Sequence, residues 1–159
     1  MLDVACGQGR HLRYLLSLGF AVVGVDRDEQ ALSALGENGA EVRVADIETG
    51  PWPFAPGAFD GVVVTNYLHR PIFPDLVGAL RPGGVLIYET FALGNERYGR
   101  PSNPDFLLRP GELLESVEPL AVIAFEQGLV SSPKQALIQR ICAVRAGPGS
   151  SGVEVIALK

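Results

Sequence analysis

The sequence is poor in cysteine and in long apolar runs, and each shortage excludes a class of protein. Two cysteines, Cys6 and Cys142, cannot build a disulfide framework, so we expect the chain in the reducing cytoplasm. No apolar run approaches the length of a membrane span, and no basic-then-apolar signal segment opens the sequence. We therefore expect no membrane partner.

Basic residues are also scarce, because 13 Lys and Arg stand against 18 Asp and Glu for a net charge of −5. Phosphate binding needs a basic face, so we expect no nucleic-acid partner. The length of 159 residues, with 47% hydrophobic residues, suits one domain with a substantial core. No repeat, low-complexity tract or metal-ligand pattern indicates a second domain or a metal site.

The most informative stretch that is present lies at residues 2–9, LDVACGQG. Leu2 and Val4 belong to a short buried strand, Gly7 and Gly9 follow at once, and residues 10–16 have helical spacing of their apolar positions. Strand, glycine turn and helix in this order open a nucleotide-type site in an α/β sheet. Glycines allow a tight turn and a close ligand, and the first helical N–H groups are free to bind it.

Two acidic residues and one leucine narrow the choice of ligand. A dinucleotide fingerprint would place a third glycine where this chain has Leu12. Asp26, after a strand expected over residues 20–25, suits both hydroxyls of a ribose, whereas Asp3 would repel a pyrophosphate and attract an ammonium group. A ligand with a ribose, a cationic amino group and no phosphate fits best, and S-adenosylmethionine is such a ligand. An NAD(P) oxidoreductase is the disfavoured alternative.

Four blocks carry a resemblance to a known family: residues 2–10 (LDVACGQGR), 24–26 (GVD), 45–47 (ADI) and 80–84 (LRPGG). In this order and spacing the chain resembles a class I S-adenosylmethionine-dependent methyltransferase, similar to the small bacterial tellurite-resistance group. The family often has glycine where this chain has Ala5, which is a mild departure.

The resemblance implies a single α/β domain over residues 1–159. Its fold would be a Rossmann-like, seven-stranded and mostly parallel sheet with an antiparallel C-terminal hairpin and helices on both faces. Family members place one or two helices before the first strand, and Met1 already stands at that strand. We therefore expect a chain truncated relative to the family, or an apolar sheet face covered by a partner, with a homodimer as one form.

The resemblance also implies a donor site for S-adenosylmethionine, whose product is S-adenosylhomocysteine. The expected donor-site residues are Asp3, Ala5, Cys6, Gly7, Gly9, Asp26, Arg27, Asp46, Ile47, Asn66 and Tyr67. The first turn would hold the methionine portion, Asp26 the ribose, and Asp46 with Ile47 the adenine. Two alternatives stay open: Asp46 as a loop acid that caps a turn, and Cys6 as a packing residue instead of a reactive thiol.

The acceptor should lie beyond a strand over residues 59–64, because ligands gather at the carboxyl ends of parallel strands. Asn66, Tyr67 and His69 follow this strand. Tyr67 and His69 are the candidate catalytic residues. His69 has the chemistry of a general base, and the alternative is a surface residue ahead of the helix that starts near Pro71.

A long segment over residues 91–109 has no periodic pattern but several aromatic residues, which indicates an ordered flap over the substrate side. Arg97, Arg100 and Arg109 place positive charge there in an acidic protein. Solvated surface charge is one interpretation, and recognition of an anionic small substrate is the other. If the segment recognises a substrate, the candidate residues are His69, Arg97, Tyr98 and Arg100.

The remaining periodic segments complete the expected sheet. Helices are expected over residues 10–19, 28–38 and 71–80 and from residue 110, and further strands over residues 2–4, 41–44, 85–90, 120–125, 136–144 and 153–158. The expected activity is methyl transfer from S-adenosylmethionine to a small-molecule acceptor. A non-catalytic module that binds S-adenosylmethionine is the alternative.

Overall fold

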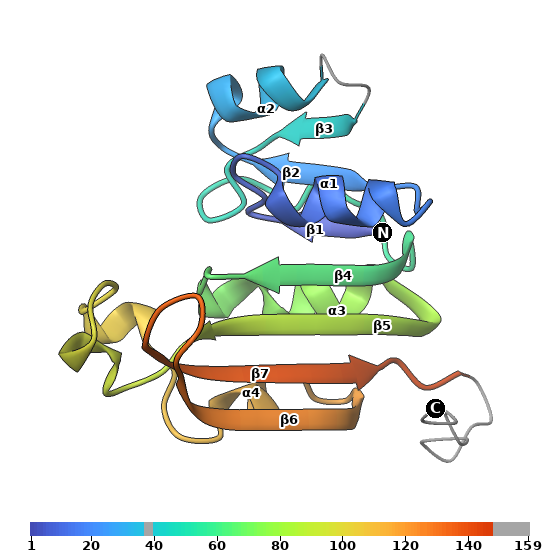
Figure 1. Ribbon diagram of the computed structural model, residues 1–159. Coiled ribbons are helices and arrows are strands. Elements are labelled where there is room, and N and C mark those ends of the chain that lie inside the picture. Colours follow the sequence, from blue (N-terminus) through green and yellow to red (C-terminus); the bar gives the residue numbers. More distant parts are fainter. Residues whose placement is uncertain (37–39, 148–159) are drawn as a thin grey trace.

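The computed structural model describes residues 1–36 and 40–147, which form a seven-stranded sheet between two layers of helices (Figure 1). The strands are β1 (Leu2–Val4), β2 (Val23–Asp26), β3 (Glu41–Val44), β4 (Phe59–Thr65), β5 (Leu80–Phe91), β6 (Ala121–Val130) and β7 (Ala136–Val144). The helices are α1 (Arg10–Ser17), α2 (Glu29–Gly36), α3 (Phe73–Ala79) and α4 (Glu112–Ser116). The expected strand over residues 153–158 lies outside the described residues.

The strand order is β3-β2-β1-β4-β5-β7-β6. Strands β1 to β5 pair in parallel, whereas β7 runs antiparallel to both β5 and β6. The predicted fold class, with its antiparallel last pair, is therefore confirmed. The order reverses between β1 and β4, and in open α/β sheets ligands bind at the carboxyl ends of strands at such a reversal.

The core lies mainly between the sheet and the helices behind it in Figure 1, α3 and α4. Alternate residues of β4 and β5 point into this layer, so Val62, Val64 and Leu86 are fully buried. Phe73 of α3 stacks on Tyr88 of β5 with ring centroids 5.0 Å apart. The Tyr88 hydroxyl donates to the Tyr67 carbonyl at 2.7 Å and so fixes the chain just beyond β4.

Several element boundaries differ from the sequence prediction. Strand β2 begins at Val23 and not at residue 20, because its ladder with the short β1 starts at the Leu2–Val23 pair. Strand β5 already begins at Leu80, through an irregular register next to β4. A single turn of 3-10 helix over Arg70–Ile72 precedes α3, where Pro71 favours a helical start.

The flap that follows β5 contains two short 3-10 turns, Asn95–Arg97 and Pro104–Phe106, and lies beside the carboxyl end of β5 (Figure 1). Asn95 is 1% exposed and acts as its inner anchor. Its side chain accepts the Leu137 N–H and donates to the Pro101 carbonyl, both at 3.1 Å. These contacts give the segment a defined conformation.

A buried carboxylate ties the far end of the flap to the body of the protein. Glu112, at the start of α4, is 4% exposed and accepts from Arg70 Nε at 2.6 Å and from the Arg109 N–H at 2.7 Å. Burial acts to raise the pKa of Glu112, but the hydrogen bonds from Arg70 and Arg109 outweigh it and hold this pKa below its usual value. The carboxylate is therefore ionised at neutral pH and joins two loops.

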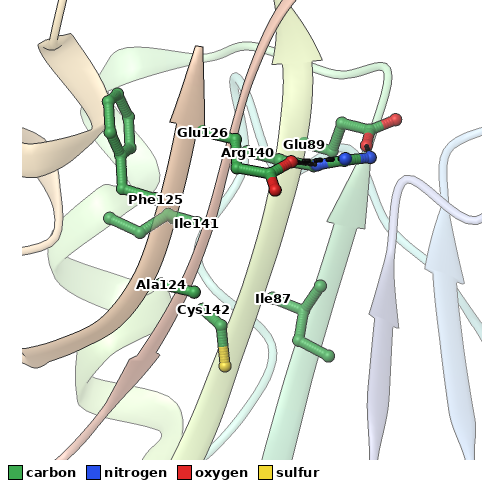
Figure 2. Close-up of a pocket in the computed structure, with 8 residues that line it drawn as sticks. All are labelled: Ile87, Glu89, Ala124, Phe125, Glu126, Arg140, Ile141 and Cys142. Atoms are coloured by element: carbon green, nitrogen blue, oxygen red, sulfur yellow. Dashed lines mark hydrogen bonds and ion pairs between the residues drawn. The ribbon is translucent and has the colours of Figure 1, made fainter.

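The face of β5, β7 and β6 on the α1 side carries no helix in the described part of the chain (Figure 1). A shallow groove of about 270 Å³ runs over it, with Ile87, Ala124 and Cys142 on its floor (Figure 2). Ile87 is 45% exposed there, although it lies in the middle of the sheet. Among the described helices, none has the length and apolar character needed to cross a membrane.

Glu112→Gln should lower the free energy of unfolding by about 2 kcal/mol, because it weakens charge-assisted hydrogen bonds to a buried group. The matched control is Glu115→Gln, whose side chain is 76% exposed on the same helix and lies 3.9 Å from Arg109. This control should change stability by less than about 0.5 kcal/mol. Urea unfolding measures both, and equal effects of the two substitutions would contradict the anchoring role of Glu112.

Candidate functional site

The turn between β1 and α1 is built from left-handed backbone. Ala5, Gly7 and Gly9 have φ values of 52°, 50° and 71°. The Cys6 N–H donates to the Val25 carbonyl at 3.1 Å, which holds the turn against β2. A left-handed Ala5 carries a steric cost that glycine would not carry. This cost is a physical reason for the glycine that the family named above often has at this position.

The two glycines of the turn are required for different reasons. At Gly9 a Cβ atom would lie 2.6 Å from a methyl group of Leu35, so this glycine lets α2 approach the turn. At Gly7 a Cβ atom would meet nothing within 4 Å, so only the backbone conformation favours glycine there. The space over Gly7 is open, and a ligand can approach the backbone closely.

Leu12 has a structural reason for replacing the third glycine of a dinucleotide fingerprint. It is the fully buried residue of α1, and a Cβ atom on Gly24 of β2 would lie only 2.6 Å from its side chain. The close contact of helix and strand is thus provided by a glycine on the strand and not on the helix. The sequence argument against a dinucleotide therefore corresponds to a real difference in packing.

Asp26 connects the glycine turn to the end of β2. Its Oδ2 atom accepts the Gly7 N–H at 2.8 Å, and its Oδ1 atom accepts the Asp28 N–H at 3.0 Å. A carboxylate has about four acceptor positions, so both oxygens can still accept hydrogen bonds from a ligand. The predicted role of Asp26 toward a ribose stays a prediction that this geometry permits.

Asp3 lies beneath the turn and is 2% exposed. Its Oδ2 atom accepts the Leu12 N–H at 2.8 Å and so binds one of the free donors of the first turn of α1. Burial raises the pKa of Asp3 to about 6, against the opposing effects of the Leu12 hydrogen bond and of Arg10. The structure thus gives Asp3 a role in fixing the turn, and its attraction for an ammonium group stays a prediction.

Cys6 has the environment of a packing residue. Burial, followed by the negative charges of Asp3 and Asp26, raises the pKa of its thiol to about 12. A thiol with this pKa is protonated at neutral pH and is a poor nucleophile. Of the two interpretations of Cys6, the structure favours packing.

A cavity of about 30 Å³ opens beside the turn, at the carboxyl ends of the central strands. Six of the predicted donor-site residues line it together with Ala45 and Glu48: Ala5, Asp26, Arg27, Asp46, Ile47 and Tyr67. This volume suits about two water molecules, so the cavity would have to widen to admit a nucleoside. The fold thus gathers in one place residues that are up to 62 positions apart in the sequence.

Tyr67 is the one described residue with a buried side-chain polar atom that lacks a hydrogen-bond partner, and that atom is its hydroxyl oxygen. Burial first, and then the charge and the hydrogen-bonding reach of the nearby Glu48 carboxylate, raise the pKa of Tyr67 above its usual value, so the phenol is protonated. A buried O–H group without a partner costs about 1–3 kcal/mol. A bound ligand that accepts this hydrogen bond would remove the cost.

Asp46 makes the contacts of a turn cap. Its Oδ1 atom accepts the Glu48 N–H at 2.9 Å, and its Oδ2 atom accepts from the Thr49 hydroxyl at 2.8 Å. The Glu48 hydrogen bond, followed by that of Thr49, lowers the pKa of Asp46. The capping interpretation therefore describes the free protein, and a further contact to an adenine stays a prediction.

The residues predicted for the acceptor side are only partly brought together. Asn66, directly after β4, has a left-handed φ of 54° and donates its N–H to the Glu89 carbonyl at 2.9 Å. Strained backbone of this kind clusters at functional sites. The other candidates do not line the cavity beside the turn: His69, Arg97, Tyr98 and Arg100. Arg97 donates to the Gly94 carbonyl at 3.3 Å inside the flap.

Sequence reasoning missed a polar band that crosses the α1 side of the sheet. His11 Nδ1 lies 3.0 Å from Thr65 Oγ1, and Thr65 is paired with Glu89. Glu89 lies 3.6 Å from Arg140 of β7, which also binds Glu126 of β6 (Figure 2). In a strand over residues 85–90, side chains alternate between the two faces, so Glu89 shares a face with Ile87. No sequence pattern indicates that His11 lies near this face.

The raised pKa of Asp3 predicts how stability depends on pH. Because the folded protein binds this proton more tightly than the unfolded chain, the stabilisation is complete below pH 3.8 and is lost as pH rises through about 6. Asp3→Asn keeps an oxygen for the Leu12 N–H without the titration. The stability of the wild type relative to this variant should fall by up to about 3 kcal/mol between pH 4 and pH 7. A constant difference in urea unfolding across this range would contradict the assignment.

The chain is similar in sequence to known methyltransferases. Residues 2–88 match the family described as "Methyltransferase domain". A ribosomal protein L11 methyltransferase of Vibrio cholerae is 39% identical over 92 residues, which cover 54% of this chain and 31% of that protein. The corresponding protein of Thiobacillus denitrificans is 40% identical over 92 residues, which cover 55% and 30%. The chain thus spans about a third of the length of the curated relatives it matches.

Solved structures share the fold at low identity. TehB from Haemophilus influenzae has a TM-score of 0.74 at 18% identity, with 91% of this chain and 57% of that chain covered. A S-adenosylmethionine-dependent methyltransferase from Methanosarcina mazei has a TM-score of 0.72 at 18% identity, with 91% of both chains covered. The family match over more than half of the residues, on a sheet of this topology, shows that the chain belongs to the methyltransferase-domain family of class I S-adenosylmethionine-dependent methyltransferases.

Proposed function

We propose that this protein transfers the methyl group of S-adenosylmethionine to a small-molecule acceptor. The observation that carries the proposal is the cavity beside the glycine turn, which gathers Asp26, Asp46 and Tyr67 at the carboxyl ends of the central strands. The cavity lies next to the switch between β1 and β4, where this class of sheet binds its ligands.

The residues present fit the methyl donor. The open backbone at Gly7 would receive the methionine portion, with Asp3 adding negative charge beneath the turn. Asp26 would accept hydrogen bonds from the ribose hydroxyls. Asp46 and the Ile47 amide would meet the adenine, and the unpartnered Tyr67 hydroxyl would donate to the nucleoside. Acidic residues dominate the cavity, which disfavours a phosphate-bearing ligand.

The methyl donor supplies an electrophilic methyl group, and the protein supplies position. An acceptor held in line with the methyl–sulfur bond reacts without a covalent enzyme intermediate, and orientation provides much of the rate. Asn66 and Tyr67 lie where β4 ends and would form the boundary between donor and acceptor. Tyr67 and His69 are the predicted catalytic candidates, and of the two only Tyr67 lines the cavity.

A small acceptor fits the rest of the chain. The net charge of −5 disfavours a polyanion, and the anchored flap lies beside the carboxyl end of β5 (Figure 1). His69, Arg97, Tyr98 and Arg100 are the candidates that would select the acceptor, with an anionic small molecule favoured by the arginines. The curated relatives are named for ribosomal protein L11, so that protein belongs in any acceptor panel.

Asp26→Asn should weaken binding of S-adenosylmethionine by about 10- to 100-fold, because it removes a charged acceptor worth about 1.5–3 kcal/mol. Isothermal titration calorimetry measures the change. Asp28→Asn is the matched control, because asparagine caps a helix as well as aspartate and Asp28 caps α2 through the Ala31 N–H at 3.0 Å. Unchanged affinity in the Asp26 variant, or tighter binding of NAD, would contradict the proposed donor site.

Catalysis is tested with tritium-labelled methyl donor and a panel of phenols, thiols, amines and ribosomal protein L11. Label transferred to a small molecule supports the proposal, and transfer only to the protein replaces the small-molecule acceptor with a protein one. Tight donor binding without any transfer across the panel would favour the alternative, a non-catalytic module that binds S-adenosylmethionine.

A further inference from the structure

His11 holds a position that neither the cavity nor the motifs explain. It is the second residue of α1, directly after the glycine turn, and its half-buried ring reaches across to the last residue of β4. Its Nδ1 atom lies 3.0 Å from Thr65 Oγ1. Within the described chain no other group hydrogen-bonds the ring, so Nε2 is free.

The charges around His11 come from three directions. Arg10 neighbours it on α1, Glu89 faces it from β5, and Arg140 of β7 neutralises Glu89 in part. Burial, followed by the charge of Arg10, lowers the pKa of His11, and Glu89 opposes this effect. At neutral pH the ring is therefore uncharged and has one nitrogen lone pair available.

The Thr65 hydroxyl can select which nitrogen carries the proton. A hydroxyl can donate to a bare Nδ1 or accept from Nδ1–H, and the second arrangement puts the proton on Nδ1 and leaves the lone pair on Nε2. Without this partner, an imidazole usually carries its proton on Nε2 and would have no lone pair there. The second arrangement is the one that a base at Nε2 requires, and in it Thr65 is a positioning residue for the ring.

We propose that His11 is the general base that removes the proton of the acceptor during methyl transfer, with Thr65 setting its tautomer. The inference rests on the proposed function and deepens it, because it requires an acceptor with a removable proton, such as a phenol, a thiol or an ammonium. The acceptor lone pair forms the new bond to the methyl carbon, the carbon–sulfur bond breaks, and its electron pair stays on sulfur. The acceptor proton passes to His11 Nε2.

The chain contains two histidines, so nuclear magnetic resonance reads each ring separately, and His69→Asn assigns the signals. Long-range ¹H–¹⁵N spectra of the full chain report the tautomer directly. We expect the wild type to carry the His11 proton on Nδ1, and Thr65→Val to move it to Nε2. A wild-type ring protonated on Nε2 would overturn the proposal.

Titration in the two donor complexes tests the location of the ring. S-adenosylmethionine carries a positive sulfonium and S-adenosylhomocysteine does not, so His11 should titrate at least about half a pH unit lower in the first complex. His69 serves as the internal comparison. Equal His11 titration in both complexes, or a larger difference at His69, would overturn the base role while leaving the donor site intact. Spectra unchanged by either ligand would overturn the proposed function as well.

Turnover supplies the last readout. With a phenol, thiol or amine of the panel that is methylated, His11→Asn should lower kcat at least tenfold at pH 7 and leave donor affinity unchanged. Tyr14→Phe, a change at a 61% exposed residue of the same helix, should leave kcat unchanged. Full activity of the His11 variant would overturn the proposal.

Discussion

The hydrogen bond from the Gly7 N–H to Asp26 is the contact on which the site depends. It holds the turn after β1 against the end of β2. The backbone hydrogen bond from the Cys6 N–H to the Val25 carbonyl holds the same turn one residue earlier. A turn with left-handed residues is costly unless its surroundings hold it in place. On the other side of the turn, the Asp3 carboxylate accepts the Leu12 N–H in the first turn of α1.

The same two acids explain the choice of ligand. They accept the Gly7 and Leu12 N–H groups, which would otherwise be free to hold a phosphate. The turn therefore presents open backbone over Gly7 and negative charge around it. In the proposed donor site a cationic amino-acid nucleoside would meet attraction, whereas a diphosphate would meet repulsion. The polar band of His11, Thr65 and Glu89 continues the site toward the ends of β4 and β5.

The sheet, and the gathering of six donor-site candidates beside the turn, could be predicted from local patterns of glycines, strand ends and acids. Asp26 ends β2 and Asp46 lies two residues beyond the end of β3, so a parallel sheet had to bring them together. His11 was missed because its partner Thr65 is 54 residues away and its helical position reads as surface. The anchoring of Glu112 by Arg70 was hidden in the same way, by a separation of 42 residues.

The central claim is that the turn and the cavity beside it hold S-adenosylmethionine or its product. A crystal structure of the complex with S-adenosylhomocysteine tests it most directly. The account predicts ribose hydroxyls on Asp26, adenine between Ile47 and Tyr67 with a partner for the Tyr67 hydroxyl, and the amino-acid portion over Gly7. Ligand density anywhere else, with Asp26 free of contact, would contradict it.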